Sequence, residues 1–370
     1  MIKHLFLLFF LGYVFCCSAQ DGNICDGPYL NYKNGYGIIK LIDQKGKLVV
    51  DSFPESKKRS YEIVVHFSNH KNQDFSVLLR KKIEDEKTVW TAPDKIIAMS
   101  DIEGEFEATR NLLVKGGVMD SAYRWTFGKG SLVICGDLFD RGNDVMAELW
   151  LLYKLEDEAR EKGGNVHTIL GNHDVMNLSG DYRYVQQKYF DNAKLMQVEY
   201  ATLYGRDTEL GRWLRSKNTI EKIGDNLYLH GGISPAILAR KMSLDVINEV
   251  CRPYYDQGHH LENFSDTSLR IFFGRDALFW YRGYFMDPRA SQSFVDSTLA
   301  FYHAKRIIIG HTITDSNIAS YYEGKIIGID VNEHEGHSEA ILVQKSRISV
   351  MDKDGKVRPI IAGPANSVIE

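Results

Sequence analysis

Five short apolar runs, each closely followed by a polar residue able to bind a metal ion, constrain this chain more than any other feature. They are IIAM (96–99), SLVIC (131–135), VHTIL (166–170), NLYL (226–229) and RIIIG (306–310). Runs of this length, rich in β-branched residues, are typical of buried β-strands. In open α/β sheets the functional groups gather beyond the carboxyl ends of the strands, so we expect the five polar ends to meet in one site.

The segments around these runs predict the organisation of the rest of the chain. Before position 94, apolar stretches such as YGIIKLI and YEIVVHF are separated by polar, turn-forming residues, a pattern typical of antiparallel hairpins. After it, apolar runs alternate with helix-like segments, which indicates βαβ units and a partly parallel sheet. We therefore predict an α/β fold with an N-terminal β-rich segment (20–94), a catalytic domain (95–345) and a C-terminal tail (346–370).

The first 19 residues have the form of a secretory signal peptide. Lys3 precedes an apolar run at 5–15, and small residues lead to a cleavage site after Ala19. A transmembrane anchor is one alternative, but about 11 apolar residues are too few for a bilayer that requires about 20. A lipoprotein modified at Cys16 or Cys17 is another, disfavoured by the residue that would precede the modified cysteine. The prediction is a secreted or periplasmic protein without stable membrane insertion.

Composition excludes several other classes of protein. The 370-residue chain is 44% hydrophobic, which excludes intrinsic disorder, and its net charge of −4 lacks the basic excess of a nucleic-acid-binding protein. Cleavage after Ala19 removes Lys3 and two cysteines, leaving Cys25, Cys135 and Cys251. Cys135 ends a buried run and is predicted to be a core residue. Both a Cys25–Cys251 disulfide and two free thiols are compatible with the sequence.

The residues after the five runs form a set of metal ligands. They read SDIEG (100–104), GDLFDRG (136–142), GNHD (171–174), HGG (230–232) and GHT (310–312). Two divalent ions about 3.5–4 Å apart need a bridging carboxylate, further oxygen and imidazole ligands, and a position open to water. Asp137 is the expected bridge, with Asp101 and Glu103 completing one metal site and Asn172, His230 and His311 the other. The metal-activated hydroxide would then attack phosphorus in line.

Three further residues supply the remaining chemistry. His173 adjoins Asn172 in the sequence, so we expect it beside the metals, where it can protonate the leaving alkoxide. Asp140 is predicted to hold the His173 ring and to stabilise its protonated form. Arg141 carries a planar guanidinium that matches two oxygens of a phosphate group. Together these residues predict the hydrolysis of a phosphate ester.

The order of these motifs resembles that of the calcineurin-like metallophosphoesterases, and among them the phosphoprotein phosphatases, whose pattern runs GDxHG, GDxxDRG, GNHE, HGG and a late histidine. The stretches GNHDVMNLSGDYRYV (171–185) and ALFWYRGYF (277–285) are similar to the Shewanella-like phosphatase group. The resemblance covers about residues 95–345. It implies two mixed β-sheets packed as a sandwich flanked by helices, a phosphoprotein substrate, and a second phosphate-binding arginine at Arg282.

The sequence departs from the family pattern at two positions. Asp174 replaces the glutamate of GNHE, a conservative change outside the metal shell. Glu103 replaces the histidine of GDxHG, and as a ligand its carboxylate would favour harder ions such as Mn²⁺ or Mg²⁺. The alternative is that Glu103 bonds to a residue outside the metal shell and leaves that ion weakly held. We expect two divalent ions, Mn²⁺ before Fe, Zn or Mg.

The leading hypothesis is a secreted, dinuclear-metal-dependent phosphomonoesterase acting on phosphoprotein, at Ser/Thr, Tyr or both, or on a small phosphomonoester. A nucleotide phosphatase or phosphodiesterase of the same fold is the alternative enzyme, although two arginines favour a monoester dianion over a diester. A phosphate-ligand binding protein with impaired hydrolysis is the alternative outside enzymes. Such a binding protein would not require His173, Asp140 and the two arginines, so their presence argues against it.

Two features near the motifs receive no role from the sequence. His334 and His337, in the polar stretch NEHEGHSE, are predicted to lie in a solvated hairpin turn. Asp330 follows an apolar run and is expected near the site without an assigned function.

Overall fold

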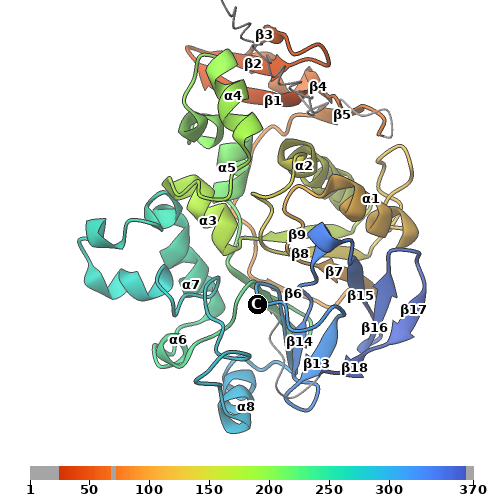
Figure 1. Ribbon diagram of the computed structural model, residues 1–370, viewed down its shortest axis with the longest axis vertical. Helices are drawn as coiled ribbons and strands as arrows, with labels where there is room; N and C mark the ends of the chain where they lie inside the picture. The colour runs from red at the N-terminus through yellow and green to blue at the C-terminus, as the bar shows by residue number, and fades with distance from the viewer. Residues whose placement is uncertain (1–24, 68–71, 364–370) are drawn as a thin grey trace, which may run out of the picture.

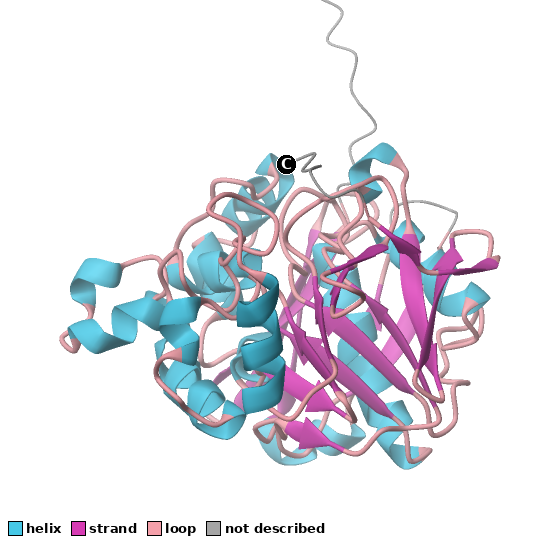
Figure 2. Cartoon of the chain, turned by 90° about the horizontal axis from the view of Figure 1, so that it is seen from below, coloured by secondary structure: helices cyan, strands magenta, loops and turns pink. Residues whose placement is uncertain are grey.

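Two large β-sheets run through the middle of the molecule, with helices around them (Figures 1 and 2). This computed structural model describes residues 25–67 and 72–363. The predicted signal peptide lies outside the described residues. The predicted fold class, an α/β fold with two mixed sheets flanked by helices, is confirmed.

The first sheet has the strand order β17-β16-β15-β7-β8-β9 among the described residues. Its parallel strands are β7 (Lys95–Met99), β8 (Ser131–Cys135) and β9 (Asn165–Ile169), joined by α1 (Phe106–Lys115) and α2 (Val145–Glu161). These strands correspond to the first three apolar runs, so the predicted βαβ units are confirmed. Antiparallel strands complete the sheet: β15 (Glu339–Gln344), β16 (Arg347–Asp352) and β17 (Val357–Pro359).

The second sheet has the order β18-β13-β14-β12-β11-β10-β6 within the same described ranges. Its strands are β6 (Val89–Trp90), β10 (Ile220–Ile223), β11 (Asn226–Leu229), β12 (Arg306–Ile309), β13 (Ala319–Tyr321), β14 (Ile326–Gly328) and β18 (Ile361–Ala362). The fourth and fifth apolar runs form β11 and β12, which are parallel. The described part of the expected tail, residues 346–363, thus contains three strands: β16 and β17 extend the first sheet, and β18 extends the second.

Alternation along β7 divides its side chains between two cores. Ile96 and Ala98 pack between the two sheets, together with Ile308 of β12. Ile97 and Met99 point to the opposite face and pack in the larger core, which contains the buried residues of α1 and α2. Since successive side chains of a strand point to opposite faces, a fully apolar strand needs cover on both sides. The crossover helices α1 and α2 return the chain so that β7, β8 and β9 are parallel, which brings their carboxyl ends to one edge.

The remaining helices surround this framework. The α-helices are α3 (Asn172–Ser179), α4 (Gln187–Leu195), α5 (Glu209–Arg215), α6 (Pro235–Leu238), α7 (Leu244–Cys251) and α8 (Gln292–Phe301). The short 3₁₀ segments are η1 (Glu55–Ser60), η2 (Tyr200–Tyr204), η3 (Arg252–Gln257), η4 (Leu261–Asn263), η5 (Thr267–Phe272) and η6 (Glu333–Glu335). Within the described ranges, no helix combines the length and apolar character needed to cross a bilayer.

The N-terminal segment forms two small sheets of its own, at the top of Figure 1. They contain β1 (Asp26–Lys33), β2 (Tyr36–Ile42) and β3 (Leu48–Pro54), and β4 (Glu62–Val65) with β5 (Phe75–Leu78). The indole of Trp150, on α2, donates to the Pro28 carbonyl at 2.8 Å, and the Tyr32 hydroxyl donates to Glu209, on α5, at 2.8 Å. The buried apolar residues of these five strands belong to the larger core. The segment therefore flanks the catalytic sheets.

The cysteines are all free thiols in the described chain. Cys25, Cys135 and Cys251 are each buried and unbridged. The Cys25 thiol donates to the carbonyl of His66 at 3.4 Å, whereas Cys251 ends α7. The possible disulfide between Cys25 and Cys251 is therefore not formed, and hydrophobic packing with hydrogen bonds attaches the N-terminal segment to the rest of the molecule.

Candidate active site

The polar ends of the five strands meet at one edge of the sheets, around a cavity of about 290 Å³. Seven of the ten predicted site residues line it: Asp101, Glu103, Asp137, Arg141, His173, Arg282 and His311. The other three lie directly behind this lining, where Asn172 and His230 contact each other and Asp140 contacts His173. The structure thus brings all ten together: the nine that follow the five runs, as the strand pattern predicted, and Arg282, which the family resemblance predicted.

Asp137 occupies the centre of the cluster. Its Oδ2 lies 3.1 Å from His230 Nε2, which is also 3.0 Å from Asn172 Oδ1. Two groups of potential ligands share this aspartate: Asp137 with His230 and His311, and Asp137 with Glu103 and His173, each within 4.8 Å. A shared carboxylate is the arrangement that a bridging ligand requires.

The imidazole of His230 is oriented by its second nitrogen. Nδ1 lies 2.7 Å from the carbonyl oxygen of Cys135, the last residue of β8. A carbonyl only accepts hydrogen bonds, so Nδ1 carries the proton and Nε2 faces Asp137. A backbone acceptor of this kind is how metal-ligating histidines are usually held.

The charges of the cavity fit a divalent cation. Burial raises the pKa of both Asp101 and Asp330, which lie near Asp137. Burial alone would lower the pKa of His230, but Asp137 and Asp101 raise it to about 10, so a metal ion bound at Nε2 would displace a proton there. Burial and the neighbouring His230 lower the pKa of His311, so this imidazole is neutral, as a metal ligand must be. Carboxylates crowded in a buried site with neutral imidazole and amide oxygen suit hard divalent ions.

The backbone of the site is held in an unusual conformation. Several site residues have left-handed φ values of 40–81°: Asp101, Glu103, Asp137, Asp140, Arg141 and His311. Such conformations cost about 1–3 kcal/mol each for residues other than glycine and persist only where surrounding contacts enforce them. One contact is the backbone N–H of His311, which donates to Asp101 Oδ2 at 3.1 Å. These six residues lie in the turns that aim the ligands into the cavity.

Asp174 organises the loops behind Asp137. Its carboxylate accepts hydrogen bonds from the backbone N–H groups of Gly171 at 2.7 Å, Asp137 at 3.1 Å and Leu138 at 2.9 Å. Gly171 is required for this close approach, because a Cβ there would lie 2.1 Å from Asp137 Oδ1. Asp174 thus lies outside the metal-binding groups, and its shorter side chain still reaches three backbone donors.

His173 and Asp140 form the predicted pair. His173 Nδ1 lies 2.6 Å from Asp140 Oδ2, and Asn177 donates to the other Asp140 oxygen at 2.8 Å. His173 Nε2 faces the cavity, 3.9 Å from both Glu103 Oε1 and Asp137 Oδ2. Although burial lowers the pKa of His173, Asp137 and Asp140 raise it above its ordinary value. The pair can therefore hold a proton at Nε2 and deliver it into the cavity.

A comparison with known families identifies this arrangement. The sequence model described as calcineurin-like phosphoesterase matches residues 94–315, which cover the ends of all five strands. This chain belongs to the calcineurin-like phosphoesterases.

Relatives of this phosphoesterase are named as protein phosphatases. A crystal structure of the cold-active protein-tyrosine phosphatase of a psychrophilic Shewanella species is 34% identical, with a TM-score of 0.81 over 90% of this chain and 98% of that one. Shewanella-like protein phosphatase 2 of Arabidopsis thaliana is 25% identical over 90% of this chain and 91% of its own length. Shewanella-like protein phosphatase 1 of Plasmodium berghei is 28% identical over 64% and 66%. The chain is a phosphatase-type hydrolase, and its family implies divalent metal ions.

The two arginines of the phosphoesterase lie on the cavity wall. Arg282 donates to the carbonyl oxygen of His311 and, at 3.2 Å, to Thr312 Oγ1, which holds its guanidinium beside the ligands. The sequence alone had not distinguished Arg282 from a surface arginine; only the family resemblance marked it. Arg141 is bonded to Glu103 and lies 5.5 Å from the centroid of the Tyr184 ring.

Glu103 has partners at both carboxylate oxygens. Oε1 accepts from Arg141, and Oε2 lies 2.7 Å from His334 Nε2. The other His334 nitrogen lies 2.8 Å from Glu105 Oε1. His334 and His337 are both exposed, as a solvated turn implies, but His334 also lines the cavity, which its prediction did not include. The polar composition of the stretch did not indicate that its loop contacts Glu103, which lies 231 positions earlier in the sequence. The ligand role of Glu103 stays a prediction.

Proposed function

We propose that this chain is a secreted, dinuclear-metal-dependent phosphomonoesterase that acts on phosphoprotein. The observation that carries the proposal is the shared position of Asp137 in two ligand groups, beside a protonatable histidine and two arginines on one cavity. Asp101, Glu103, Asp137, Asn172, His230 and His311 would hold the ions. When bound, divalent ions, with Mn²⁺ the first expected, activate water for attack on phosphorus and offset the charge of the phosphate.

The remaining chemistry belongs to the side chains of this chain. Arg282 and Arg141 bind the phosphate oxygens, and Arg141 must exchange its bond to Glu103 for one to substrate. His173 donates its Nε2 proton to the leaving oxygen, while Asp140 holds Nδ1 and stabilises the charged ring. The leaving group departs as an alcohol or phenol without a covalent phosphoenzyme.

Phosphoprotein is preferred over nucleotide as the substrate class because the similar Shewanella protein is named a protein-tyrosine phosphatase and the Arabidopsis protein a protein phosphatase. The decisive assay measures release of phosphate from a phosphotyrosine peptide, a phosphoserine peptide and a nucleoside monophosphate, with and without Mn²⁺. We expect metal-stimulated turnover that is highest with a phosphopeptide. Preference for the nucleotide would support the alternative phosphatase of the same fold.

The matched controls separate hydrolysis from binding. His173→Asn should reduce the rate constant by about 10²–10⁴-fold, the range of a lost general acid, with a smaller change in KM. Lys353→Gln, at an exposed lysine on the loop after β16, should leave the rate unchanged. If the wild-type chain shows no metal-stimulated turnover above the His173→Asn level, it is a phosphate-ligand binding protein instead.

Secretion is proposed from the sequence of residues 1–19. The expected mature N-terminus is Gln20, since the pattern favours cleavage after Ala19. Expression of the full sequence with recovery from the extracytoplasmic fraction and N-terminal sequencing tests this. Recovery of protein that begins at residue 1 in the cytosolic fraction would contradict it.

A further inference from the structure

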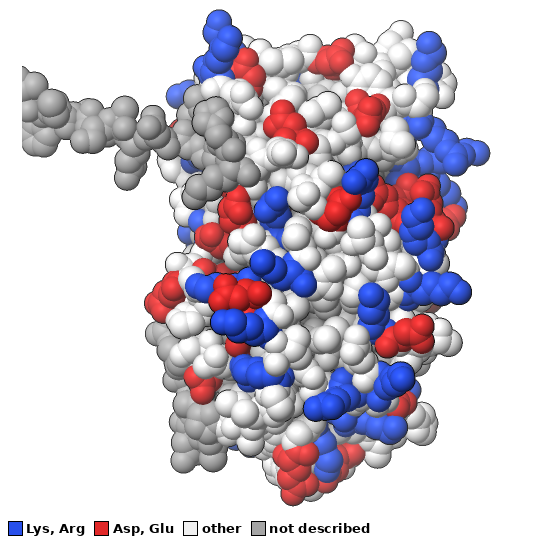
Figure 3. All heavy atoms as spheres, turned by 90° about the vertical axis from the view of Figure 1, so that its right-hand side faces the viewer, with Lys and Arg blue, Asp and Glu red and all other residues white. Residues whose placement is uncertain are grey.

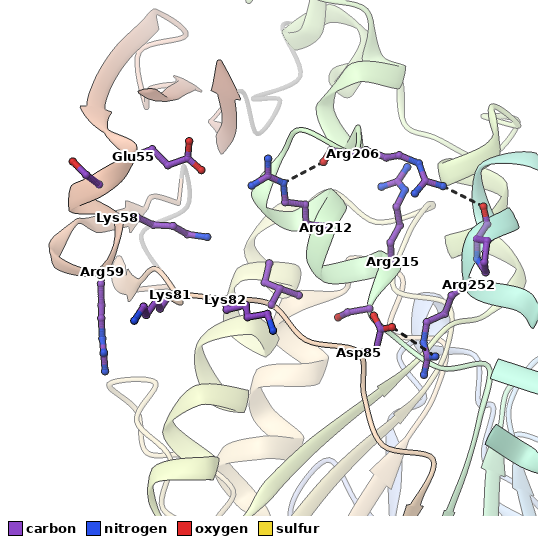
Figure 4. Close-up of a pocket in the computed structure, with 14 residues that line it drawn as sticks. Glu55, Lys58, Arg59, Lys81, Lys82, Asp85, Arg206, Arg212, Arg215 and Arg252 are labelled. Atoms are coloured by element: carbon purple, nitrogen blue, oxygen red, sulfur yellow. Dashed lines mark hydrogen bonds and ion pairs between the residues drawn. The ribbon is translucent and has the colours of Figure 1, made fainter. Parts of the chain in front are cut away.

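A second cavity, which we call the basic hollow, lies between the N-terminal segment and α5 (Figure 4). It has a volume of about 960 Å³ and shares no lining residue with the active-site cavity. Eight basic residues line it: Lys58, Arg59, Lys81, Lys82, Arg206, Arg212, Arg215 and Arg252. Two acidic residues, Glu55 and Asp85, are the other charged members of the lining.

This excess of basic residues is local. The chain as a whole has a net charge of −4, and on the face drawn in Figure 3 basic and acidic side chains alternate. In the hollow, by contrast, basic residues converge from η1, from the loop after β5, from α5 with the turn before it, and from η3. Bringing like charges together raises the energy of the folded chain unless a counter-charge is supplied.

Acidic residues behind the lining neutralise part of this charge. Lys58 pairs with Glu209 at 2.7 Å, and Asp256 is shared by Arg206, at 2.6 Å, and Arg215. Lys82 pairs with Glu84 at 3.0 Å, although both side chains are exposed. Eight basic residues thus meet five acidic ones in and around the hollow.

Three lining cations keep their charge for a ligand. In the described parts of the chain, Arg59, Lys81 and Arg212 form no ion pair within 4.0 Å. The guanidinium carbon of Arg212 lies 4.6 Å from the centroid of the Tyr32 ring, and Lys58 Nζ lies 5.1 Å from the same ring. The Tyr32 ring therefore lies beside one cation from η1 and one from α5, and Figure 4 shows Lys58 and Arg212 on facing sides of the hollow.

The lining also indicates the kind of anion. Five guanidiniums line the hollow, of which Arg206 and Arg215 are already paired with Asp256. The guanidiniums of Arg59 and Arg212 keep N–H donors that match phosphate oxygens, and exposed lysines add point charges at the rim. Among the described residues that line the hollow, Ile83 and Pro253 are the apolar ones, and none is aromatic or belongs to a strand. Such walls offer little surface for stacking a base, and no strand edge to pair with an extended peptide.

We propose that the basic hollow binds a compact polyphosphate anion, a ligand with two or more linked phosphate groups. The volume exceeds what a single phosphate fills, and the spread of the cations suits several charged groups in one ligand. The ligand contacts both the N-terminal segment and the predicted catalytic domain (95–345), so its binding stabilises the junction between them. This inference does not rest on the proposed phosphatase activity, since the two cavities are separate.

The test titrates the full chain with tripolyphosphate at low salt, without added divalent ions, by isothermal calorimetry and by thermal unfolding. The Lys81→Glu/Lys82→Glu variant reverses two exposed rim charges, and Lys353→Glu/Lys356→Glu makes the same net change on the exposed loop after β16. We expect binding to the wild type that is at least tenfold weaker in the first variant and within twofold in the second. Arg212→Met, which removes a half-buried cation, should weaken binding by at least as much.

Two further arms locate and identify the ligand. Asp137→Asn changes the active site and should bind tripolyphosphate as the wild type does; loss of binding there would place the ligand in the other cavity and overturn the proposal. Titrations with ATP and with tripolyphosphate compare a phosphate chain on a nucleotide with a free phosphate chain. The compound that binds more tightly shows which of these two kinds of ligand the hollow takes. No binding by the wild type, equal losses in both double variants, or tenfold tighter binding of a doubly phosphorylated peptide would each overturn it.

Discussion

Replacing Glu156 by glutamine should destabilise the folded chain by about 3–5 kcal/mol, the range for breaking a buried ion pair from one side. Glu156 lies on α2 with 1% of its surface exposed. Its Oε1 accepts from Arg80 at 2.7 Å and Arg160 at 2.6 Å, and its Oε2 accepts from Lys217 at 2.7 Å and the Trp213 indole at 2.8 Å. This one carboxylate therefore joins the loop after β5, in the N-terminal segment, to α2 and to the end of α5.

The size of the effect follows from what remains after substitution. Lys217 has no exposed side-chain surface, and its other carboxylate partner is Glu86 at 2.8 Å. Glutamine keeps one acceptor oxygen but turns an amide N–H₂ group toward these cations. Lys217 and Arg160 are then left with Glu86, and Arg80 with Asp157 at 3.7 Å. With about 2.1 cal/mol/K of unfolding entropy per residue over 370 residues, a loss of about 3–5 kcal/mol lowers the Tm by roughly 4–6 °C.

The deficit should depend on pH with a definite sign. Although burial raises the pKa of Glu156, Lys217 and Arg80 lower it well below its ordinary value. A carboxyl whose pKa is depressed by folding stabilises the native state above its unfolded pKa of about 4.3, and that contribution is lost as the pH falls through the folded value. The difference between wild type and Glu156→Gln is therefore largest near neutral pH and shrinks in acid.

Differential scanning calorimetry from pH 7.5 down to about pH 2.5, which spans the unfolded pKa of about 4.3 on both sides, measures this directly. Glu161→Gln, at the exposed end of the same helix, serves as the matched control and should change the Tm by less than about 1 °C, as surface substitutions do. A Glu156→Gln protein that unfolds with the Glu161→Gln protein at pH 7.5, or a deficit that grows in acid, would refute the reasoning.

The other predictions concern the active site. Asp140→Asn should lower kcat by about 10²–10⁴-fold, and adding it to His173→Asn should cost little more, because Asp140 acts through His173; additive losses would contradict this. Glu103→His should keep activity but change metal preference, measured as the metal content after dialysis against mixed Mn²⁺ and Zn²⁺. Unchanged metal content and unchanged dependence of the activity on the metal ion would remove Glu103 from the ligands. His334→Ala removes a partner of Glu103 and should weaken Mn²⁺ binding by about 10–100-fold in calorimetry, with the exposed His337→Ala as control; equal affinities would leave His334 without a role.

The strands of the catalytic body could be predicted because their signal is local. An apolar run such as 131–135 is buried on both faces whatever its partners are, and the polar residue that follows it must lie at the sheet edge. The same logic placed Asp137, His230 and His311 together without any knowledge of the loops. Residues 346–370 were harder, because short strands such as β18 are recognisable only from the neighbour with which they pair.

Long-range contacts explain what the sequence did not indicate. His334 lies in a polar stretch that reads as solvated, and only the return of that loop across the cavity places it on Glu103. The number of cysteines in the sequence allowed a disulfide between Cys25 and Cys251, yet the fold leaves both as buried free thiols. The basic hollow joins residues 55–59 to residues 206–253, two segments whose basic residues are unremarkable when each is read alone.

The sequence by itself determined the fold class, the meeting of the candidate ligands at one edge and the pairing of His173 with Asp140, because apolar periodicity fixes the strands and each motif carries its chemistry within a few residues. The tertiary structure alone decided which groups compensate one another: Glu103 with Arg141 and His334, and Glu156 with the cations around it. The physical reason is the range over which each kind of interaction acts. Backbone preference and burial act on neighbours along the chain, whereas charge compensation depends on distance in space, which the chain acquires only on folding.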